Sequence, residues 1–353
     1  MIPKKTILVA PLHWGLGHAT RCIPIINALL DHNFNVIIAS DGGALLLLQK
    51  EFPLLKTIEL PSYQIEYPKK GKNFKINLLL KLPAIRKAIS KEKKIIEELV
   101  NNNSLDGIIS DNRFGVHHEN IPSVFITHQI KVLSGSTTFI SSKIHHNIIK
   151  KFDECWVPDI EGKLNLSGKI GHIKNTPFKV KYIGVLSRMK KLNLPKVYDI
   201  LILLSGPEPQ RTLLEVQLLE VFKDSKYKVL MVRGVVENNQ TKYKLNNIKI
   251  VNFMATSELE KTINESNLVI SRSGYTTIMD LTVLEKKAFL IPTPGQFEQE
   301  YLAKRLKKLG LVASCKQDNF TLKKVKKVKE YIGLNEIENR TDFKELFSLF
   351  EGK

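Results

Sequence analysis

The chain has 353 residues, of which 43% are hydrophobic and 25% charged, a composition that excludes disordered and fibrous proteins. Its length favours two domains over one. Lys and Arg number 54 against 35 acidic residues, so the formal net charge is +19. Such an excess points either to an anionic partner or to a compositional bias, since Lys, Ile and Asn are abundant throughout.

The cysteines and the apolar runs indicate the cellular compartment in which we expect the protein. Cys22, Cys155 and Cys315 are far apart and show neither C-x-x-C nor Cys/His metal spacing, which argues against disulfide scaffolds and zinc sites and favours a reducing cytoplasm. The apolar stretch at the N-terminus is too short for a signal peptide. No run approaches the roughly 18 apolar residues of a membrane span, so any membrane contact is expected to be peripheral.

Strand-length apolar runs alternate with segments of helical period along the first half, a pattern that predicts βαβ units and a parallel sheet. The predicted strands are 6–12, 35–40, 106–110, 123–128 and 154–158. A helix is predicted over 19–32, where apolar residues recur at helical intervals. The long segment 76–100 also has helical character, and Pro83 predicts a kink or break in it.

The same alternation restarts after a polar, basic stretch. The predicted strands of this second half are 199–205, 228–234, 248–253, 268–273 and 288–293, with a helix over 210–224. We therefore expect two α/β domains, residues 1–184 and 198–353, joined by a linker over 185–197.

The first strand leads into the loop "PLHWGLGHATRC" (11–22). In an open parallel sheet, ligands bind outside the carboxyl ends of the strands. Gly15 and Gly17 ease the turn into a helix whose first amides favour an anion. His18 stands at the junction of loop and helix, where it either acts as a general base or caps the helix. Two glycines after a strand are also common in simple turns.

Two loops of the second half offer similar chemistry. In "LLSGPEPQRT" (203–212), Ser205 and Gly206 precede a helix and suit a phosphate, although an ordinary βα turn stiffened by prolines explains them equally. In "RSGYTTIMDL" (272–281), Gly274 allows close approach to another helix start, and Asp280 is placed to accept ribose hydroxyls.

The stretch "PTPGQFEQEYLAKRL" (292–306) follows the next strand and carries amides and a carboxylate suited to sugar hydroxyls. Together with "RSGYTTIMDL", it resembles the donor-binding region of glycosyltransferase family 28, which includes the N-acetylglucosaminyltransferase that forms lipid II. "GLGHATR" (15–21) resembles the N-terminal glycine loop of that family. The resemblance implies a GT-B fold, with two Rossmann-like domains whose parallel sheets face each other across a cleft. It further implies that the first domain binds the acceptor and the second a nucleoside diphosphate sugar.

The resemblance also implies roles for individual donor-site residues. Asp280 becomes the ribose ligand, although the family more often has glutamate there, and Met254 falls where the family's backbone reads the uracil edge. Arg188 matches an arginine at the end of the interdomain connection, and in that position it would neutralise the leaving diphosphate. The diphosphate turn would comprise Ser273, Gly274, Tyr275 and Thr276; the sugar contacts would be Gln299 and its neighbour Gln296. Ser205 and Gly206 stand where the family has a loop richer in glycine.

On this reading His18 removes the proton of the acceptor hydroxyl in an inverting transfer, while helix dipoles and cations stabilise the departing diphosphate. The chain lacks the Asp-x-Asp pair of metal-dependent transferases, so we expect neither a metal nor another cofactor. Gly15 and Gly17 would approach the acceptor, together with Asp111, Arg113 and His128 at the ends of two strands. Each of two residues also has a purely structural interpretation. Asp111 would then build a turn, and His128 would pack as a hydrogen-bonded histidine.

The acceptor is expected to differ from that of the lipid II enzyme, because "SDNRFG" and "THQ" replace its more glycine-rich acceptor region. A glycan or lipid-linked acceptor of the cell envelope fits best, reached at the inner face of the membrane. "LLLKLP" (78–83), flanked by Lys72, Lys75, Lys81, Arg86 and Lys87, is either a face resting on anionic lipid or a core helix.

Two other functions remain open from the sequence. A nucleotide-sugar hydrolase or epimerase would share the donor loops and use water or a second base in place of an acceptor. A nucleic-acid-binding protein rests on charge alone, since the lysines are scattered and no recognised nucleic-acid-binding motif is present. UDP is the nucleotide that the resemblance favours, and TDP and GDP remain open.

Overall fold

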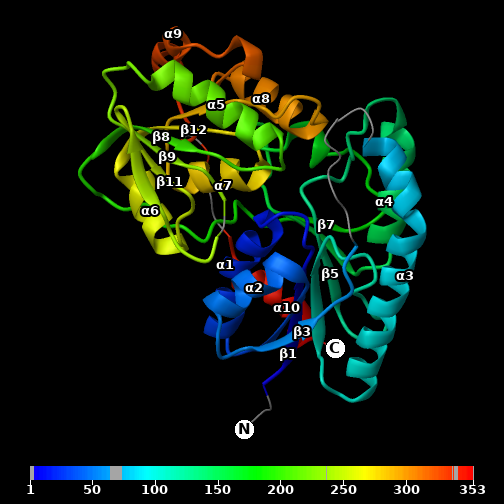
Figure 1. Cartoon of the computed structure of the whole chain (residues 1–353). Helices are drawn as coiled ribbons and strands as arrows, with labels where there is room; N and C mark the ends of the chain where they lie inside the picture. Colours follow the sequence, from blue (N-terminus) through cyan, green and yellow to red (C-terminus); the bar gives the residue numbers. More distant parts are fainter. Residues whose placement is uncertain (1–3, 64–73, 236, 336, 338–340, 353) are drawn as a thin grey trace. The chain divides into compact units, whose positions relative to one another are not determined.

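The computed structural model describes residues 4–63, 74–235, 237–335, 337 and 341–352, which form two α/β units (Figure 1). The N-terminal unit contains the described residues within 1–66, 73–187 and 339–353, and the C-terminal unit contains those within 188–338. The predicted α/β fold class, with two sheets, is confirmed.

The N-terminal unit is built on a seven-stranded parallel sheet with the order β3-β2-β1-β4-β5-β6-β7. Its strands are β1 (Thr6–Pro11), β2 (Asn35–Ser40), β3 (Lys56–Glu59), β4 (Gly107–Asp111), β5 (Ser123–Ile126), β6 (Glu154–Val157) and β7 (Val180–Tyr182). β4, β5 and β6 are buried at every position. Burial on both faces explains why the central strands read as continuous apolar runs without alternation.

Five α-helices accompany this sheet among the described residues: α1 (Gly17–Asp31), α2 (Gly42–Glu51), α3 (Phe74–Asn101), α4 (Thr138–Ile149) and α10 (Phe343–Glu351); short 3₁₀ turns lie at Gly135–Thr137 and Gly168–Ile170. α3 continues through Pro83 as one helix, so of the predicted kink or break at this residue, the break is wrong. Ile85 packs in the core, whereas Leu82, Arg86 and Lys87 are exposed. The predicted basic residue Lys72 lies outside the described residues, as does the side chain of Lys75.

The C-terminal unit contains a second seven-stranded sheet with the order β10-β11-β9-β8-β12-β13-β14. Its strands are β8 (Tyr198–Leu203), β9 (Val229–Val232), β10 (Lys242–Leu245), β11 (Ile248–Val251), β12 (Ser266–Ser271), β13 (Ala288–Leu290) and β14 (Ala313–Ser314). All pairs are parallel except β10 with β11. β10 is exposed at every position, so the apolar pattern could not predict this edge strand. The prediction of a parallel sheet is confirmed for the rest of the unit, and β10 adds one antiparallel edge strand.

The helices of this unit are α5 (Gln210–Phe222), α6 (Thr256–Asn264), α7 (Tyr275–Val283), α8 (Phe297–Lys308) and α9 (Leu322–Val325), with 3₁₀ turns at Gln317–Asn319 and Lys326–Glu330. Strand and helix residues form one apolar core that includes Ile202, Met231, Ile270 and Phe320.

The predicted domain boundaries need two corrections. α10 follows the C-terminal unit in sequence but belongs to the N-terminal unit, where Phe347 and Phe350 pack against Trp156. The units divide between Ser187 and Arg188, inside the predicted linker 185–197. Most of that stretch is fastened to the C-terminal unit, where Leu192 N donates to Asn264 Oδ1 at 3.0 Å.

Each sheet changes direction at one point of its strand order. In the N-terminal unit, β1 is paired with β2 on one side and β4 on the other. In the C-terminal unit, β8 is paired with β9 and β12 in the same way. Loops that leave the carboxyl ends of such paired strands diverge and open a crevice for a ligand. These two points are therefore where each unit is expected to bind.

Candidate active site

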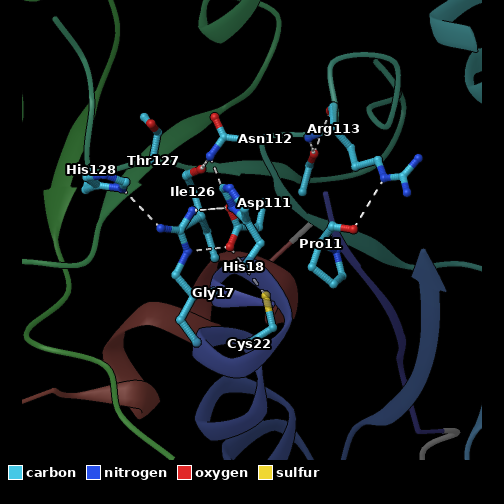
Figure 2. Close-up of polar contacts among 12 residues, drawn as sticks. Pro11, Gly17, His18, Cys22, Asp111, Asn112, Arg113, Ile126, Thr127 and His128 are labelled. Atoms are coloured by element: carbon cyan, nitrogen blue, oxygen red, sulfur yellow. Dashed lines mark hydrogen bonds and ion pairs between the residues drawn. The ribbon is translucent and has the colours of Figure 1, made fainter. Parts of the chain in front are cut away.

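The strand register of the N-terminal unit brings together three loops that are distant in sequence. Pro11 at the end of β1 pairs with Asp111 at the end of β4, and Asp111 pairs with Ile126 at the end of β5. The loop after β1 leads into α1, which carries His18, and His128 follows β5 by two residues. Figure 2 shows His18, Asp111 and His128 gathered at this edge of the sheet.

His18 and Asp111 form a close polar pair. Nδ1 of His18 lies 2.8 Å from Oδ1 of Asp111. The His18 side chain is 16% exposed, whereas Asp111 is fully buried. Both contacts of the His18 ring among the described residues are made by Nδ1. Nε2 is therefore the nitrogen that can accept a proton from a bound molecule.

Arg21 completes the cluster from the next turn of α1. Its Nε donates to Asp111 Oδ2 at 2.5 Å, and its Nη2 donates to Asp111 Oδ1. Its Nη1 donates to Nδ1 of His128 at 3.1 Å. Asn112, held at a positive φ of 60°, adds a bond of 3.1 Å from Nδ2 to Asp111 Oδ1. The carboxylate is thus saturated with donors inside the unit.

The electrostatics of the cluster favour a neutral imidazole beside an ionised carboxylate. Burial lowers the pKa of His18 below its ordinary value of 6.5; Asp111 opposes this shift, and Arg21 adds to it. Burial alone would raise the pKa of Asp111, but Arg21 and His18 outweigh it and hold the pKa well below the usual range. At neutral pH, His18 is therefore able to accept a proton.

Cys22 also contacts Asp111, from the same helix as His18. Its Sγ donates to Asp111 Oδ2 at 3.7 Å. Burial and the neighbouring carboxylate raise the pKa of the thiol well above its ordinary value. A thiol held in this form is a poor nucleophile.

Arg113 was expected to contact the acceptor, and the structure corrects that expectation. Its side chain is fully buried and is directed away from His18 (Figure 2). It pairs with Asp41, and Nη1 donates to Glu92 Oε1 at 2.9 Å. Nη1 also donates to the carbonyl of Pro61, and Nε to that of Pro11. The guanidinium ties loops to the sheet and has no surface left for a ligand.

The other predicted acceptor residues lie around the cluster. Gly15 has a φ of +81°, which favours glycine at that turn, and a Cβ there would meet nothing within 4 Å. Gly17 is the first residue of α1. His128 is 9% exposed and accepts from Arg21, so the packed interpretation and the binding interpretation both retain support.

In the C-terminal unit, the register brings the two predicted phosphate loops together. Leu203 of β8 pairs with Ser271 of β12, so Ser205 and Ser273 both lie two residues beyond that pair. Gly206 has a φ of +104°. Gly274 is the N-cap residue of α7, and Tyr275 and Thr276 are the first two residues of the helix. This arrangement suits an anionic group.

The glutamines of α8 lie next to the same loop. Ser273 Oγ donates to the backbone carbonyl of Gln299 at 2.8 Å. The Gln299 side chain accepts from Thr293 N at 2.9 Å and donates to Gln296 Oε1 at 2.5 Å. Gln296 and Gln299 are therefore hydrogen-bonded to each other, and Gln299 also to the segment just after β13; their contact with a sugar stays a prediction.

The remaining predicted donor residues are spread along the unit. Asp280 lies in the second turn of α7 and is partly exposed. Met254 follows β11 and lines a shallow groove of about 550 Å³ together with Tyr243 and Lys261. β11 stands two strand spacings from β8, about 10 Å in a typical sheet. Arg188 begins the described part of the unit.

Sequence reasoning gave no role to Arg21 or Arg272, two nearly fully buried cations at these edges. Arg272 donates to the carbonyls of Pro292 and Gln210 and thereby joins the end of β13 to the start of α5. Burial lowers its pKa to about 10. The i, i+3 spacing of His18 and Arg21 on a helix was the available signal for the first of them.

The described part of the chain shows neither a cluster of metal-binding side chains nor a membrane-spanning helix. No group of three or more His, Cys, Asp or Glu side chains there is arranged to hold a metal ion. No helix there combines the length and apolarity needed to cross a bilayer. Metal independence itself stays a prediction.

The C-terminal unit is similar to a known protein family. Residues 201–345 match the glycosyltransferase family 28 C-terminal domain. Two curated relatives are each named UDP-N-acetylglucosamine–N-acetylmuramyl-(pentapeptide) pyrophosphoryl-undecaprenol N-acetylglucosamine transferase. The one from Methylobacterium radiotolerans is 35% identical over 66 residues, covering 18% of each chain. The one from Prochlorococcus marinus is 28% identical over 151 residues, covering 39% of this chain and 41% of the relative.

Solved structures extend the similarity to the whole fold. MurG of Acinetobacter baumannii matches with a TM-score of 0.60 and 14% identity, covering 99% of this chain and all of that one. The glycotransferase of kitacinnamycin matches with a TM-score of 0.66 and 11% identity, covering 99% and 95%. A UDP-glucosyltransferase of Polygonum tinctorium matches with a TM-score of 0.63 and 12% identity, covering 99% and 93%. The GT-B fold and the resemblance to glycosyltransferase family 28 are thereby confirmed, while the matched segments span less than half of the curated relatives.

Proposed function

We propose that this protein is a glycosyltransferase that moves a hexose or N-acetylhexosamine from a nucleoside diphosphate sugar, UDP first among them, to a hydroxyl of a glycan or lipid-linked acceptor. The observation that carries the proposal is the match of residues 201–345 to the family 28 C-terminal domain. Nearly all the predicted donor residues, from Ser205 to Gln299, fall inside that match.

The N-terminal unit would supply the base of an inverting transfer. Nε2 of His18 takes the proton of the acceptor hydroxyl while the oxygen bonds to the anomeric carbon of the donor sugar. The bond from that carbon to the diphosphate oxygen breaks, and the nucleoside diphosphate leaves with the bonding electrons. Asp111 stabilises the imidazolium through Nδ1, 2.8 Å away.

The C-terminal unit would hold the donor. Amides at the start of α7, around Gly274, suit the diphosphate, and Arg188 adds a cation that offsets the charge of the leaving group. Asp280 accepts the ribose hydroxyls, Met254 marks the backbone that meets the base, and Gln299 contacts the sugar. On this proposal the diphosphate is stabilised without a bound metal.

Kinetics of two variants test these roles. Nucleoside diphosphate release from UDP-, TDP- and GDP-sugars is measured with and without a polyprenyl-diphosphate-linked saccharide as acceptor, in buffer containing EDTA. His18→Ala should lower kcat by about 10²- to 10⁴-fold, the usual contribution of a general base. Asp280→Ala should mainly raise the KM for the donor.

The matched control is His32→Gln, at the exposed C-terminal end of the same helix as His18, which should retain wild-type kinetics. Unchanged kinetics in both site variants would contradict the assignment. Equal release with and without acceptor would favour a hydrolase, conversion of the donor into its epimer without net release would favour an epimerase, and dependence on an added divalent cation would contradict metal independence.

We further propose that the protein works at the inner face of a membrane, with anionic lipid as its surface partner. Support comes from the net charge of +19 and from the exposed Leu82, Arg86 and Lys87 on α3. Basic side chains beside an exposed apolar one are the combination that anionic lipid attracts.

A further inference from the structure

Arg21 is a buried cation whose every side-chain nitrogen points into the candidate active site. It is 2% exposed, lies three residues after His18 on α1 and makes contacts to residues from two other elements. A buried guanidinium is costly unless its partners are well placed. Arg21 therefore lies where it can act on both His18 and Asp111.

The contact with Asp111 is a fork that uses both carboxylate oxygens. Nε donates to Oδ2 and Nη2 to Oδ1, which fixes the plane of the carboxylate as well as its distance. Nη1 donates to His128, which in turn fixes the guanidinium from the end of β5. A lysine in this position would supply the charge without the plane.

Nδ1 of His18 lies 2.8 Å from Asp111 Oδ1 and also 2.8 Å from Nη2 of Arg21. A guanidinium only donates and an ionised carboxylate only accepts, so a protonated Nδ1 has its partner in Asp111, whereas an unprotonated Nδ1 would accept from Nη2 of Arg21. The fork already engages Nη2 with Oδ1, and an unprotonated Nδ1 would direct its lone pair at the negative charge of Oδ1, so the fork favours the proton on Nδ1.

We propose that Arg21 is a positioning residue of the transfer reaction: its fork holds Asp111 so that neutral His18 keeps its proton on Nδ1 and presents Nε2 to the acceptor hydroxyl. Only the last step of this inference, the presentation of Nε2 to the acceptor hydroxyl, rests on the proposed function. The tautomer of His18 is a property of the N-terminal unit and is measurable without any substrate.

The charged groups that face His18 come from three elements. Asp111 on β4 raises its pKa, whereas Arg21 on α1 and His128 beyond β5 lower it, in addition to the effect of burial. Cys22 faces Asp111 from α1 as a neutral thiol. Removing the positive charge of Arg21 therefore raises the pKa of His18, while a lysine in its place retains most of the charge effect.

The first test is NMR of the full chain with ¹⁵N-labelled histidine. In the wild-type protein, the neutral ring of His18 should carry its proton on Nδ1. Arg21→Lys should mix the two tautomers with little change in the titration midpoint, because the charge stays and the fork is lost. Arg21→Met should mix the tautomers and raise the midpoint by about one pH unit. His18→Gln identifies the resonances.

The second test is the pH profile of transfer. Both variants should lower kcat by about 10- to 10²-fold, the effect of a misplaced catalytic group, with donor KM within about twofold of wild type. The basic plateau should begin at the wild-type pH in Arg21→Lys and at higher pH in Arg21→Met. Lys150→Met, at an exposed position after α4 in the same unit, controls for the loss of one positive charge.

Arg21→Lys keeps a cation beside the buried carboxylate, so it keeps the proposal testable if Arg21→Met does not fold. A wild-type tautomer of His18 in every folded variant overturns the proposal, as does wild-type kcat in both variants. A merely structural role would lower the melting temperature and leave the tautomer unchanged. If the wild-type protein shows the Nδ1 tautomer but transfers no sugar, the proposed function fails and the NMR comparison still decides the role of Arg21.

Discussion

Arg113 and Arg21 are both buried arginines of the N-terminal unit, but they pair with different carboxylates. Arg113 joins Asp41 and Glu92, two carboxylates on separate elements, and its contacts lead away from His18. Tyr63 adds a hydrogen bond of 2.8 Å to Glu92. This second cluster braces the loops after β1, β2 and β4, and the position of His18 depends on it only indirectly.

We expect Arg113→Met to destabilise the N-terminal unit by about 3–5 kcal/mol, because it leaves two buried carboxylates without their cation. The free energy of unfolding, measured by urea denaturation, checks this. Lys150→Met removes an exposed charge from the same unit and should stay within about 0.5 kcal/mol of wild type. If Arg113→Met were as stable as wild type and raised only the KM for the acceptor, the original assignment of Arg113 to acceptor binding would be restored.

At the scale of elements, α10 shows that chain order and unit membership differ. The helix has an N-cap, since Asp342 Oδ1 accepts from Glu345 N at 3.0 Å. Phe347 and Phe350 are each 1% exposed. A Cβ on Gly107 of β4 would stand 2.4 Å from the Phe350 ring, so glycine is needed for this close packing. α10 is therefore part of the N-terminal core.

Phe347→Ala should lower the stability of the N-terminal unit by about 3–5 kcal/mol, the usual cost of removing a buried phenylalanine ring. Hydrogen exchange followed by mass spectrometry should show the loss of protection in β1, β4 and β6 and not in β8 or β12. Phe320→Ala, in the core of the C-terminal unit, is the matched control and should reverse the pattern. Loss of protection in β8 and β12 on changing Phe347 would show that α10 stabilises the other unit.

At the scale of the whole molecule, the two units repeat one plan. Each has a seven-stranded sheet whose order reverses once, and each has its predicted ligand loops at that reversal. The net charge of +19 belongs to the whole chain, and net charge acts on association more than on fold. The proposed contact with anionic lipid therefore has to be tested against lysines elsewhere on the surface.

Reversing the charges of Arg86 and Lys87 together should weaken binding to vesicles of phosphatidylglycerol and phosphatidylcholine by at least about tenfold, since each basic residue near the surface contributes about 1 kcal/mol. Cosedimentation at low and at physiological salt measures the change. Lys244→Glu with Lys249→Glu, on the exposed positions of β10 and β11, changes the net charge equally. Equal weakening by both pairs would show that charge alone, and not α3, carries the attraction.

The sequence by itself determined the class of fold and the location of the loops, because buried parallel strands must be apolar runs and ligand loops must follow their carboxyl ends. It also singled out His18, at the junction of the first loop and the following helix, and Asp111, at the carboxyl end of a predicted strand, as candidate site residues. The edge strand β10 escaped it, since every residue of that strand is exposed and leaves no apolar signal.

Only the tertiary structure decided what the buried charges do. Asp111 and Arg113 are two residues apart, yet the carboxylate faces His18 and the guanidinium faces Asp41. Arg21 looks like an ordinary helix residue until the register of β1, β4 and β5 places Asp111 and His128 within reach of it. Local pattern fixes which elements form, but partners more than 80 residues away in the chain are set by packing alone.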